Sequence, residues 1–387
     1  MKRIAIGQAG GPTPVINATL AGFVQEVKEE GFLVFIRNGY EGLANGDFIT
    51  GSSKLLRWVI DHTHVPGACL GSGRYPLTDE KIEQALRHLR KHRIDALVFI
   101  GGNGTMEALH KVAIAAEQKR YDLQVIGLPK TVDNDLGCTD HAPGFGSAAR
   151  YVAVATRDMS RDLLAMKNFE QLRILETMGR NTGWLAASSG LLRTYEEEGP
   201  HFVALPERSL DQEKLVTTIE GAIRKFGCAT VVVSEGVRWE NGEPIEQGQV
   251  DGRSVLGGVS SVIADYLRNE LNITVRSELL GMNQRSFSLS VSQQDHDEAY
   301  YAGVRGGQLL KQDQSGVMVA IERNDNSSTY DVNFFPARLG DVIKVGERKM
   351  PDQFIENVDT YYKWLNPLVG QDLSSYPRPF LRRSSYV

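Results

Sequence analysis

Residues 129–135 read Pro129-Lys-Thr-Val-Asp-Asn-Asp135 and follow the apolar run Leu123–Leu128. The run predicts a buried strand, and the proline directs the chain out of it into a loop. Lys130, Asp133 and Asp135 therefore meet where a strand ends. A carboxylate there can accept the proton of a hydroxyl, a second can hold a metal, and an ammonium can neutralise phosphate oxygens, as phosphoryl transfer requires. The alternative is a polar turn whose carboxylates only cap backbone amides.

Short apolar runs alternate with amphipathic stretches along the chain. This alternation predicts an α/β fold with parallel sheets and helices on both faces, in which ligands bind beyond the carboxyl ends of the strands. The expected strands are Ile4–Ile6, Leu33–Ile36, Ala96–Ile100, Val125–Leu128, Ile174–Leu175, Thr230–Val233 and Val317–Ile321, and the clearest expected helices are Asp79–Lys91 and Leu210–Lys225.

Three glycine-rich segments follow expected strands in the first third of the chain. Gly7–Asn17 precedes a helix expected from near Val15, and Phe99–Met106 precedes one expected from about Met106. Glycines at such turns let backbone amides face an anion, although a tight turn alone also explains them. The third segment, Leu70–Pro76, carries Arg74 after an expected strand end. Its guanidinium could bridge two phosphates or simply be solvated.

Later strand ends also carry polar side chains. Gln171–Glu176 is expected to be a strand that leads into Met178-Gly-Arg-Asn-Thr-Gly-Trp184, which projects Arg180. Glu235 lies at the tip of an apolar strand, where an unpaired carboxylate is costly, so it should bind a ligand hydroxyl or local backbone. Arg276 and Arg285 flank a glycine-containing segment and could converge on an anion.

Composition excludes several classes of protein. The 387 residues are 41% apolar and 24% charged with a net charge of −5, as in a globular protein of two domains. No basic field points to nucleic acid, and no apolar run is long enough to cross a membrane. Cys69, Cys138 and Cys228 show no disulfide or zinc spacing. We therefore expect a reduced, cytoplasmic compartment.

The ordered segments GGP…N, LGSGRY, IGGNGT, PKTVDND, MGRNTGW, SEGV and Arg-x5-Met-x2-Arg resemble the phosphofructokinase family from about residue 3 to residue 310. The resemblance implies a phosphofructokinase-like fold of two Rossmann-like α/β lobes with largely parallel sheets and the active site in the cleft between them. Residues 1–140 plus about 285–335 would bind the phosphoryl donor, and residues 141–284 would bind the sugar phosphate. Residues 336–387 are interpreted as a C-terminal extension. Family members form homodimers or homotetramers whose sites are completed across subunits.

The resemblance also assigns roles within a transfer from ATP or pyrophosphate to the 1-hydroxyl of fructose 6-phosphate. Asp133 would be the general base, and Thr131, Lys130, Arg74 and Arg180 would share the catalytic site. The donor would contact Gly11, Arg74, Gly102, Asn103, Gly104 and Thr105. The acceptor would contact Thr131, Asp133, Asp135, Met178, Gly179, Arg180, Glu235, Arg276, Met282 and Arg285. Magnesium, the expected cofactor, would be held by Asn103 and Asp135.

Two departures concern the metal and the donor. Asn103 stands where most members carry a metal-binding aspartate, so Asp135 would carry more of the metal binding. Gly104 is similar to the ATP-dependent members, because pyrophosphate-dependent members usually have an aspartate there that crowds the nucleotide. Lys130 and the GGPTPVIN segment are similar to the pyrophosphate-dependent branch. Since glycine leaves space for the α-phosphate and lysine excludes nothing, we expect ATP as the donor.

Two further departures concern the acceptor. Met282 replaces the usual histidine or tyrosine that helps to bind the 6-phosphate, and Gln171 replaces an arginine, although Arg173 lies close by in the sequence. Losing one charged contact weakens binding by ~1.5–3 kcal/mol. Fructose 6-phosphate is the expected acceptor, with another sugar phosphate or a polyol as alternatives. A non-catalytic sugar-phosphate sensor is disfavoured because Asp133, Asp135 and Arg74 are all present.

Overall fold

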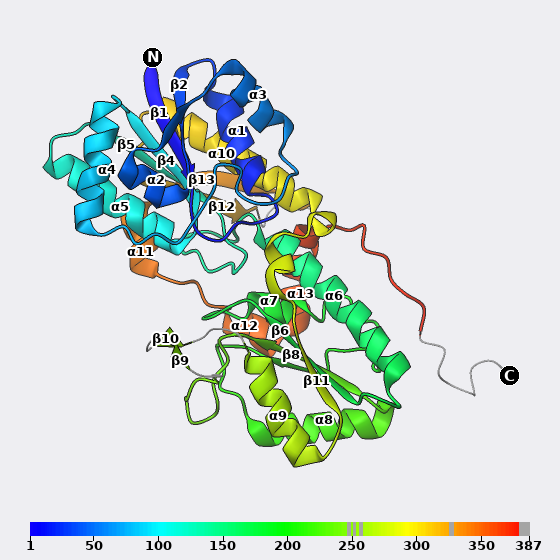
Figure 1. Cartoon of the computed structure of the whole chain (residues 1–387). Helices are drawn as coiled ribbons and strands as arrows, with labels where there is room; N and C mark the ends of the chain where they lie inside the picture. The colour runs from blue at the N-terminus through cyan, green and yellow to red at the C-terminus, as the bar shows by residue number, and fades with distance from the viewer. Residues whose placement is uncertain (246–248, 251–252, 255–257, 325–328, 379–387) are drawn as a thin grey trace. The chain divides into compact units, whose positions relative to one another are not determined.

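A computed structural model describes residues 1–245, 249–250, 253–254, 258–324 and 329–378 (Figure 1). The chain divides into two compact units. The first contains Met1–Ala148, Arg285–Arg348 and Pro367–Val369, and the second contains Ala149–Gln284, Lys349–Asn366 and the described residues from Gly370 onward.

The first unit is built on a seven-stranded sheet in the order β13-β12-β5-β4-β1-β2-β3. Its five central strands are parallel, and the edge strands β3 and β13 run antiparallel to their neighbours. The strands are β1 (Lys2–Gln8), β2 (Gly31–Ile36), β3 (Phe48–Thr50), β4 (Ala96–Gly101), β5 (Gln124–Pro129), β12 (Val317–Arg323) and β13 (Val332–Arg338).

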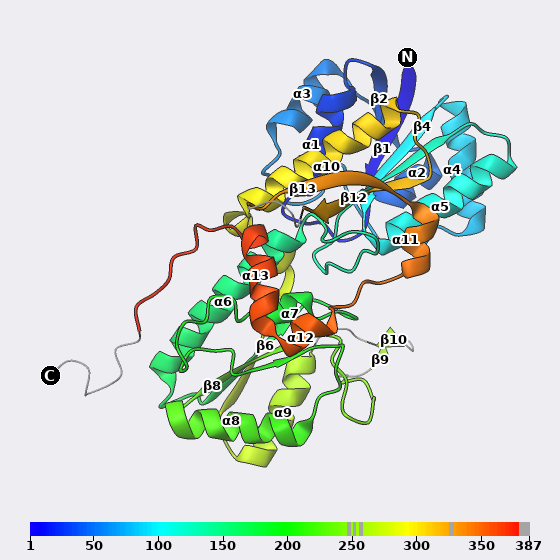
Figure 2. The same cartoon turned by 180° about the vertical axis from the view of Figure 1, so that it is seen from behind.

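Alternating apolar side chains cover both faces of this sheet. In β4, Val98 and Ile100 point to one face, and Leu97 and Phe99 point to the other. The first face packs against α1 (Ile16–Val27), α3 (Ser53–Asp61) and α10 (Gln293–Lys311). The second packs against α2 (Gly39–Asn45), α4 (Asp79–Lys91), α5 (Asn103–Gln118) and α11 (Leu339–Val345), and Figure 2 shows both layers from behind. Burial on both faces explains why the strands read as continuous apolar runs.

The second unit is built on a four-stranded parallel sheet in the order β11-β6-β8-β7. Its strands are β6 (Leu172–Thr177), β7 (Phe202–Ala204), β8 (Ala229–Ser234) and β11 (Val275–Leu279). Its helices are α7 (Trp184–Ser188), α8 (Gln212–Phe226), α9 (Val259–Leu271), α12 (Asp352–Glu356), most of α13 (Val358–Val369) and most of α6 (Phe145–Met166). Strands β9 (Gln249–Val250) and β10 (Arg253–Ser254) pair antiparallel with each other.

The predicted α/β fold class is confirmed, and each of the strands expected from an apolar run forms. Two local predictions were wrong. Residues 70–76 follow no strand, because they lie in an irregular segment between α3 and α4. Helix α5 begins at Asn103 rather than near Met106, because Gly102 adopts the extended conformation that precedes a helix (φ −94°, ψ −158°) and Asn103 continues as helix.

The described part of the extension expected over residues 336–387, which ends at residue 378, is divided between the two units. Residues 336–338 end the edge strand β13, where an antiparallel edge tolerates Pro336, and α11 follows in the same unit. Helix α12 and most of α13 belong to the second unit. Among the described residues, no helix is both long and apolar enough to cross a membrane.

Candidate functional site

The loop between β1 and α1 provides a bare stretch of backbone at the carboxyl end of β1. Gly10 has a φ of +76°, a conformation that favours glycine. A Cβ at Gly11 would lie 2.7 Å from Nη1 of Arg285, so this guanidinium packs against the backbone of the loop. Any side chain at residue 11 would displace Arg285. The guanidinium of Arg285 therefore lies directly against the predicted donor loop.

Lys130 connects the loop after β5 to this glycine loop. Its side chain is buried, and its Nζ donates a hydrogen bond of 2.6 Å to the carbonyl oxygen of Gly11. Burial lowers the pKa of Lys130 to about 8, although Asp133 and Asp135 oppose the shift, and the charges of Arg285 and Arg74 lower it further. The first unit thus brings the other four charged groups close enough to act on Lys130.

The loop after β5 is held by its own backbone and side chains. The backbone N–H of Asp133 donates to Oγ1 of Thr131 at 3.1 Å. Asn134 has a positive φ of 54°, and its Oδ1 accepts from the N–H of Ala142 at 3.1 Å. The buried Asn134 thus turns inward while the half-buried carboxylates Asp133 and Asp135 flank it on either side. The turn therefore contains a capping amide, the side chain of Asn134.

Asn103 begins α5 beside this loop. Its Nδ2 donates a 2.9 Å hydrogen bond to the backbone carbonyl of Asp135. An aspartate at this position could not donate that bond, so the amide ties the helix start to the Asp135 backbone. A Cβ built at Gly104 would meet no atom within 4 Å, whereas Thr105 is buried under the turn. The first turn of α5 is therefore open at Gly104, and its backbone amides favour an anion.

Oxygen ligands for a divalent cation are present but few. Asp133 and Asp135 supply carboxylates, and Asn103 supplies an amide oxygen, which are the hard donors that Mg²⁺ prefers. No group of three or more His, Cys, Asp or Glu residues in the described part of the chain could hold a metal. The donor set therefore fits Mg²⁺ that is also held by substrate phosphates, and not a cage made by protein alone.

The predicted acceptor residues on β6 and β8 lie together in the second unit. The N–H of Glu235 donates to the carbonyl of Thr177 at 3.0 Å, and the N–H of Gly179 donates to Oε1 of Glu235 at 3.4 Å. Gly179 has a φ of +123°, and Arg180, which follows it, is exposed. Glu235 binds local backbone, one of the two fates expected for it.

Gln284 was missed by the sequence reasoning. It is buried, and its Oε1 accepts a 3.0 Å hydrogen bond from the N–H of Met178, while its Nε2 donates to the carbonyl of Gly281. It therefore links the predicted Met178 segment to the Arg276–Arg285 segment. A single glutamine is not part of any apolar pattern, so the sequence does not distinguish the buried Gln284 from exposed polar residues beside it.

The cations on β6 and β11 are partly neutralised. Nε of Arg276 lies 3.4 Å from Oε2 of the buried Glu170, and the Arg276 side chain is 53% exposed. Arg173 is buried and bonded to Glu170 and Asp162. We therefore do not expect it to substitute for the arginine that other family members carry at the position of Gln171. Met282 is 59% exposed and adds no charge.

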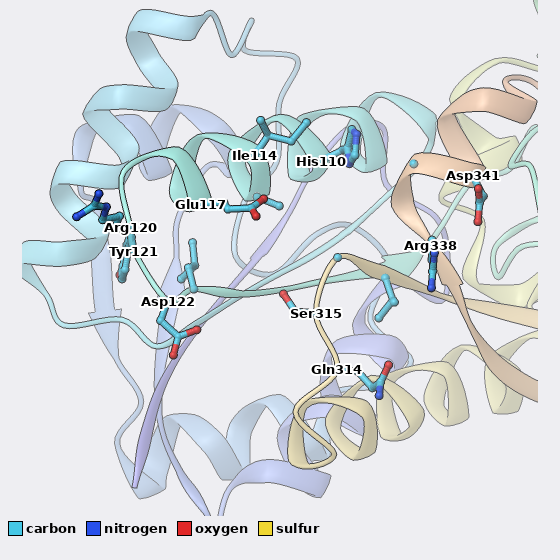
Figure 3. A pocket seen from close by; sticks show the side chains of 15 residues that line it. His110, Ile114, Glu117, Arg120, Tyr121, Asp122, Gln314, Ser315, Arg338 and Asp341 are labelled. Carbon is cyan, nitrogen blue, oxygen red and sulfur yellow. The ribbon is translucent and has the colours of Figure 1, made fainter.

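Arg285 belongs to the first unit, with the glycine loop, and not to the unit that carries Arg276. Its proposed contact with the acceptor phosphate therefore remains a prediction. Figure 3 shows a separate pocket of about 940 Å³ in the first unit, at the amino ends of β5 and β12. Its lining mixes His110, Arg120 and Arg338 with acidic side chains, and it lies at the opposite edge of the sheet from Lys130.

The family model for phosphofructokinase matches residues 3–302. The chain belongs to the phosphofructokinase family. A relative named sulfofructose kinase, from Alkalicoccus urumqiensis, is 46% identical over 368 residues, covering 95% of each chain. A pyrophosphate–fructose 6-phosphate 1-phosphotransferase from Xanthomonas campestris pv. campestris is 35% identical over 90% of this chain and 85% of its own.

Solved structures agree with this family assignment. The pyrophosphate-dependent phosphofructokinase from Marinobacter aquaeolei matches with a TM-score of 0.84 and 30% identity, covering 98% of this chain and 94% of that one. The phosphofructokinase-like fold predicted from the ordered segments is confirmed. The chain is an enzyme of the phosphofructokinase type.

Proposed function

We propose that this phosphofructokinase-family enzyme transfers the terminal phosphoryl group of ATP to the 1-hydroxyl of fructose 6-phosphate. The observation that carries the proposal is the group formed by Lys130, Arg74, Asp133 and Asp135 with the glycine loop, all in the first unit at the carboxyl ends of β1, β4 and β5. Phosphoryl transfer depends mainly on positioning and charge stabilisation, which such a group supplies.

In the proposed reaction, the oxygen of the 1-hydroxyl forms a bond to the terminal phosphorus of ATP. Asp133 accepts the proton that this hydroxyl loses. The bond between that phosphorus and the bridging oxygen breaks, and ADP leaves with the bonding electrons. Lys130 and Arg74 stabilise negative charge on the transferring group and the leaving oxygen. Asp135 and Asn103 would hold Mg²⁺ together with the donor phosphates, and the ion would supply further positive charge there. The products are fructose 1,6-bisphosphate and ADP.

The open space at Gly104 supports ATP as the donor. A nucleotide extends beyond its β-phosphate, so residues near the α-phosphate must leave room for it. A Cβ at residue 104 would meet nothing within 4 Å, and glycine adds no bulk of its own. An acidic side chain would fill this space and repel the α-phosphate.

Pyrophosphate is the second candidate donor, because of Lys130. Its buried ammonium, bonded to the carbonyl of Gly11, places a cation where a small, highly charged donor could be neutralised. The pyrophosphate-dependent relatives favour the same candidate. Lys130 does not exclude a nucleotide, whereas bulk at residue 104 would, so we keep ATP first.

A fructose that carries a sulfonate at C6 is the second candidate acceptor. A sulfonate has a single negative charge, whereas a phosphate monoester carries about −1.5 to −2 at pH 7. Met282 offers no charge, and Glu170 partly balances the charge of Arg276. This reduced positive charge suits the less charged group, in agreement with the relative named sulfofructose kinase.

The test is a matrix of two donors and two acceptors with Mg²⁺. ATP or pyrophosphate is combined with fructose 6-phosphate or 6-deoxy-6-sulfofructose, and the 1-phosphorylated product is followed. We expect ATP with fructose 6-phosphate to give the highest kcat/KM. If the enzyme turns over with pyrophosphate but not with ATP, pyrophosphate is the donor and the proposal of ATP is wrong. If it turns over with the sulfonate but not with fructose 6-phosphate, the sulfonate is the acceptor. Binding of a sugar without turnover in any combination would indicate a sensor.

A further inference from the structure

Two buried amide side chains lie at the start of the predicted donor site without a role in the chemistry. Gln8 ends β1, and Asn17 lies in the first turn of α1, with exposed fractions of 0% and 2%. Nε2 of Gln8 donates to Oδ1 of Asn17 at 3.1 Å. Such buried amides are costly unless all their polar atoms are bonded.

Three of the hydrogen bonds of the Asn17 side chain go to one segment, residues 65–69. Its Nδ2 donates to the carbonyls of Val65 at 2.8 Å and Gly67 at 2.7 Å, and its Oδ1 accepts from the N–H of Cys69 at 3.1 Å. With the bond from Gln8, the amide makes four hydrogen bonds, as many as its two donors and two lone pairs allow. Oε1 of Gln8 then accepts from the N–H of Leu70 at 3.0 Å.

This segment leads directly to Arg74. Residues 65–74 have no regular secondary structure, so side chains fix the backbone in place of a helix or sheet. Beyond Leu70, the N–H of Gly10 donates to the carbonyl of Gly73 at 3.2 Å, and Oγ of Ser72 donates to the carbonyl of Gly10 at 2.5 Å. The residue before Arg74 is thus bonded to the glycine loop.

We infer that Asn17, with Gln8, is a positioning residue that holds the Arg74 loop in register with the glycine loop for phosphoryl transfer. Asn17 touches no reacting atom and acts through Arg74, whose own side chain is exposed. An exposed arginine is directed by its backbone. That backbone is held by the bonds to Asn17, Gln8 and Gly10, together with the bond from the N–H of Asn38 to the carbonyl of Leu70. The inference rests on the proposed role of Arg74.

The test is a double-mutant cycle on the full-length enzyme with its best donor and acceptor. Asn17→Asp keeps the shape but turns two donated bonds into repulsion with the carbonyls of Val65 and Gly67. We expect kcat to fall ~100-fold in the folded protein, as a displacement of about 1 Å can cause. In an Arg74→Ala background, the same change should cost less than about twofold, because the residue it positions is gone.

Thr19→Val is the matched control. Thr19 is fully buried on the same helix, and its hydroxyl has no hydrogen-bond partner among the residues that the structure describes, so kcat should be unchanged. Circular dichroism and the thermal midpoint report folding of each variant. If Asn17→Asp does not fold, Ser72→Ala, at a half-buried residue of the same loop, replaces it in the cycle. The expectation is again a loss that disappears when Arg74 is absent.

The outcomes separate this inference from the proposed function. If Asn17→Asp slows the enzyme equally with and without Arg74, the role is structural and the inference is overturned. If Arg74→Ala is slow and Asn17→Asp is fast, the proposed function stands and only the inference falls. If Arg74→Ala turns over at the wild-type rate, the role of Arg74 fails, and the inference fails with it.

Discussion

At the scale of the residue, burial determines what Lys130 can contribute. Its ammonium donates a hydrogen bond to the backbone carbonyl of Gly11, and burial lowers its pKa to about 8. A lysine with this pKa loses its charge within the range in which enzymes are assayed. The charge that we propose stabilises the phosphates is therefore present below about pH 8 and lost above it.

The pH profile tests this charge. We expect kcat/KM to fall as pH rises through about 8, since the uncharged amine no longer neutralises phosphate oxygens. Lys130→Met should lower kcat ~100-fold at neutral pH and remove this alkaline limb. Steady-state kinetics from pH ~6 to ~10 measure both effects. A limb that persists in Lys130→Met would assign the titration to another group.

Met282 allows a gain-of-function test at the same scale. Met282→His should strengthen binding of fructose 6-phosphate about tenfold at a pH at which the histidine is charged, since a charged hydrogen bond contributes ~1.5–3 kcal/mol. Met282→Leu is the neutral control. Isothermal titration measures the Kd of fructose 6-phosphate at pH ~6, where the histidine is charged, and at pH ~8, where it is neutral. The difference between the two Kd values reports the effect of the charge, since the shape of the side chain is the same at both. Equal affinity in all three proteins would place residue 282 outside the acceptor site.

At the scale of the element, an ion pair joins the loop after β5 to α10. Nε2 of the buried His141 lies 2.6 Å from Oε2 of Glu298, and its Nδ1 lies 2.8 Å from Oδ1 of Asp140. Burial alone would lower the pKa of His141, but these carboxylates outweigh burial and raise it to about 9. The pair holds residues 139–141 to α10, only a few residues beyond Asp135.

This pair predicts a pH-dependent stability. Because the folded pKa of His141 lies above the unfolded value of 6.5, its contribution is complete below pH 6.5 and is lost as pH rises through about 9. His141→Gln leaves the buried Glu298 without its cation and should cost ~3–5 kcal/mol. Urea unfolding at pH ~6 and ~9.5 should show a smaller difference between the two proteins at the higher pH. A pH-independent difference would contradict the assignment.

The sequence predicted elements well and their side-chain bonds poorly. Apolar runs such as Ala96–Ile100 are long and continuous, so they identify strands buried on both faces. Strand β3 has only three residues and is mostly exposed, so no apolar run in the sequence predicts it. The bond of Lys130 to Gly11 spans 119 residues and the bond of Asn17 to Val65 spans 48, so no local sequence pattern encodes them.

At the scale of the whole molecule, the resemblance implies sites completed by a second subunit. Arg276 lies on the edge strand β11, with its side chain half exposed, and is a candidate for such a contribution. Asp133→Ala and Arg276→Ala subunits should each be inactive alone. Co-expressed as a dimer, they should recover roughly a quarter of the wild-type activity, because half of the dimers contain one intact site.

Light scattering gives the subunit number for this experiment. The absence of any recovery in a confirmed mixed oligomer would mean that Arg276 serves the site of its own subunit. Recovery well above the separate variants would support a shared site. Each variant alone provides the baseline.

The most direct measurement concerns Asp133. The account predicts that Asp133→Ser lowers kcat ~10²–10⁴-fold, the range for loss of a general base, while the Kd of the acceptor from isothermal titration changes little. Such a separation of turnover from binding would tie the carboxylate to the chemical step. An Asp133→Ser enzyme with a kcat near the wild-type value would contradict the proposed phosphoryl transfer through this residue.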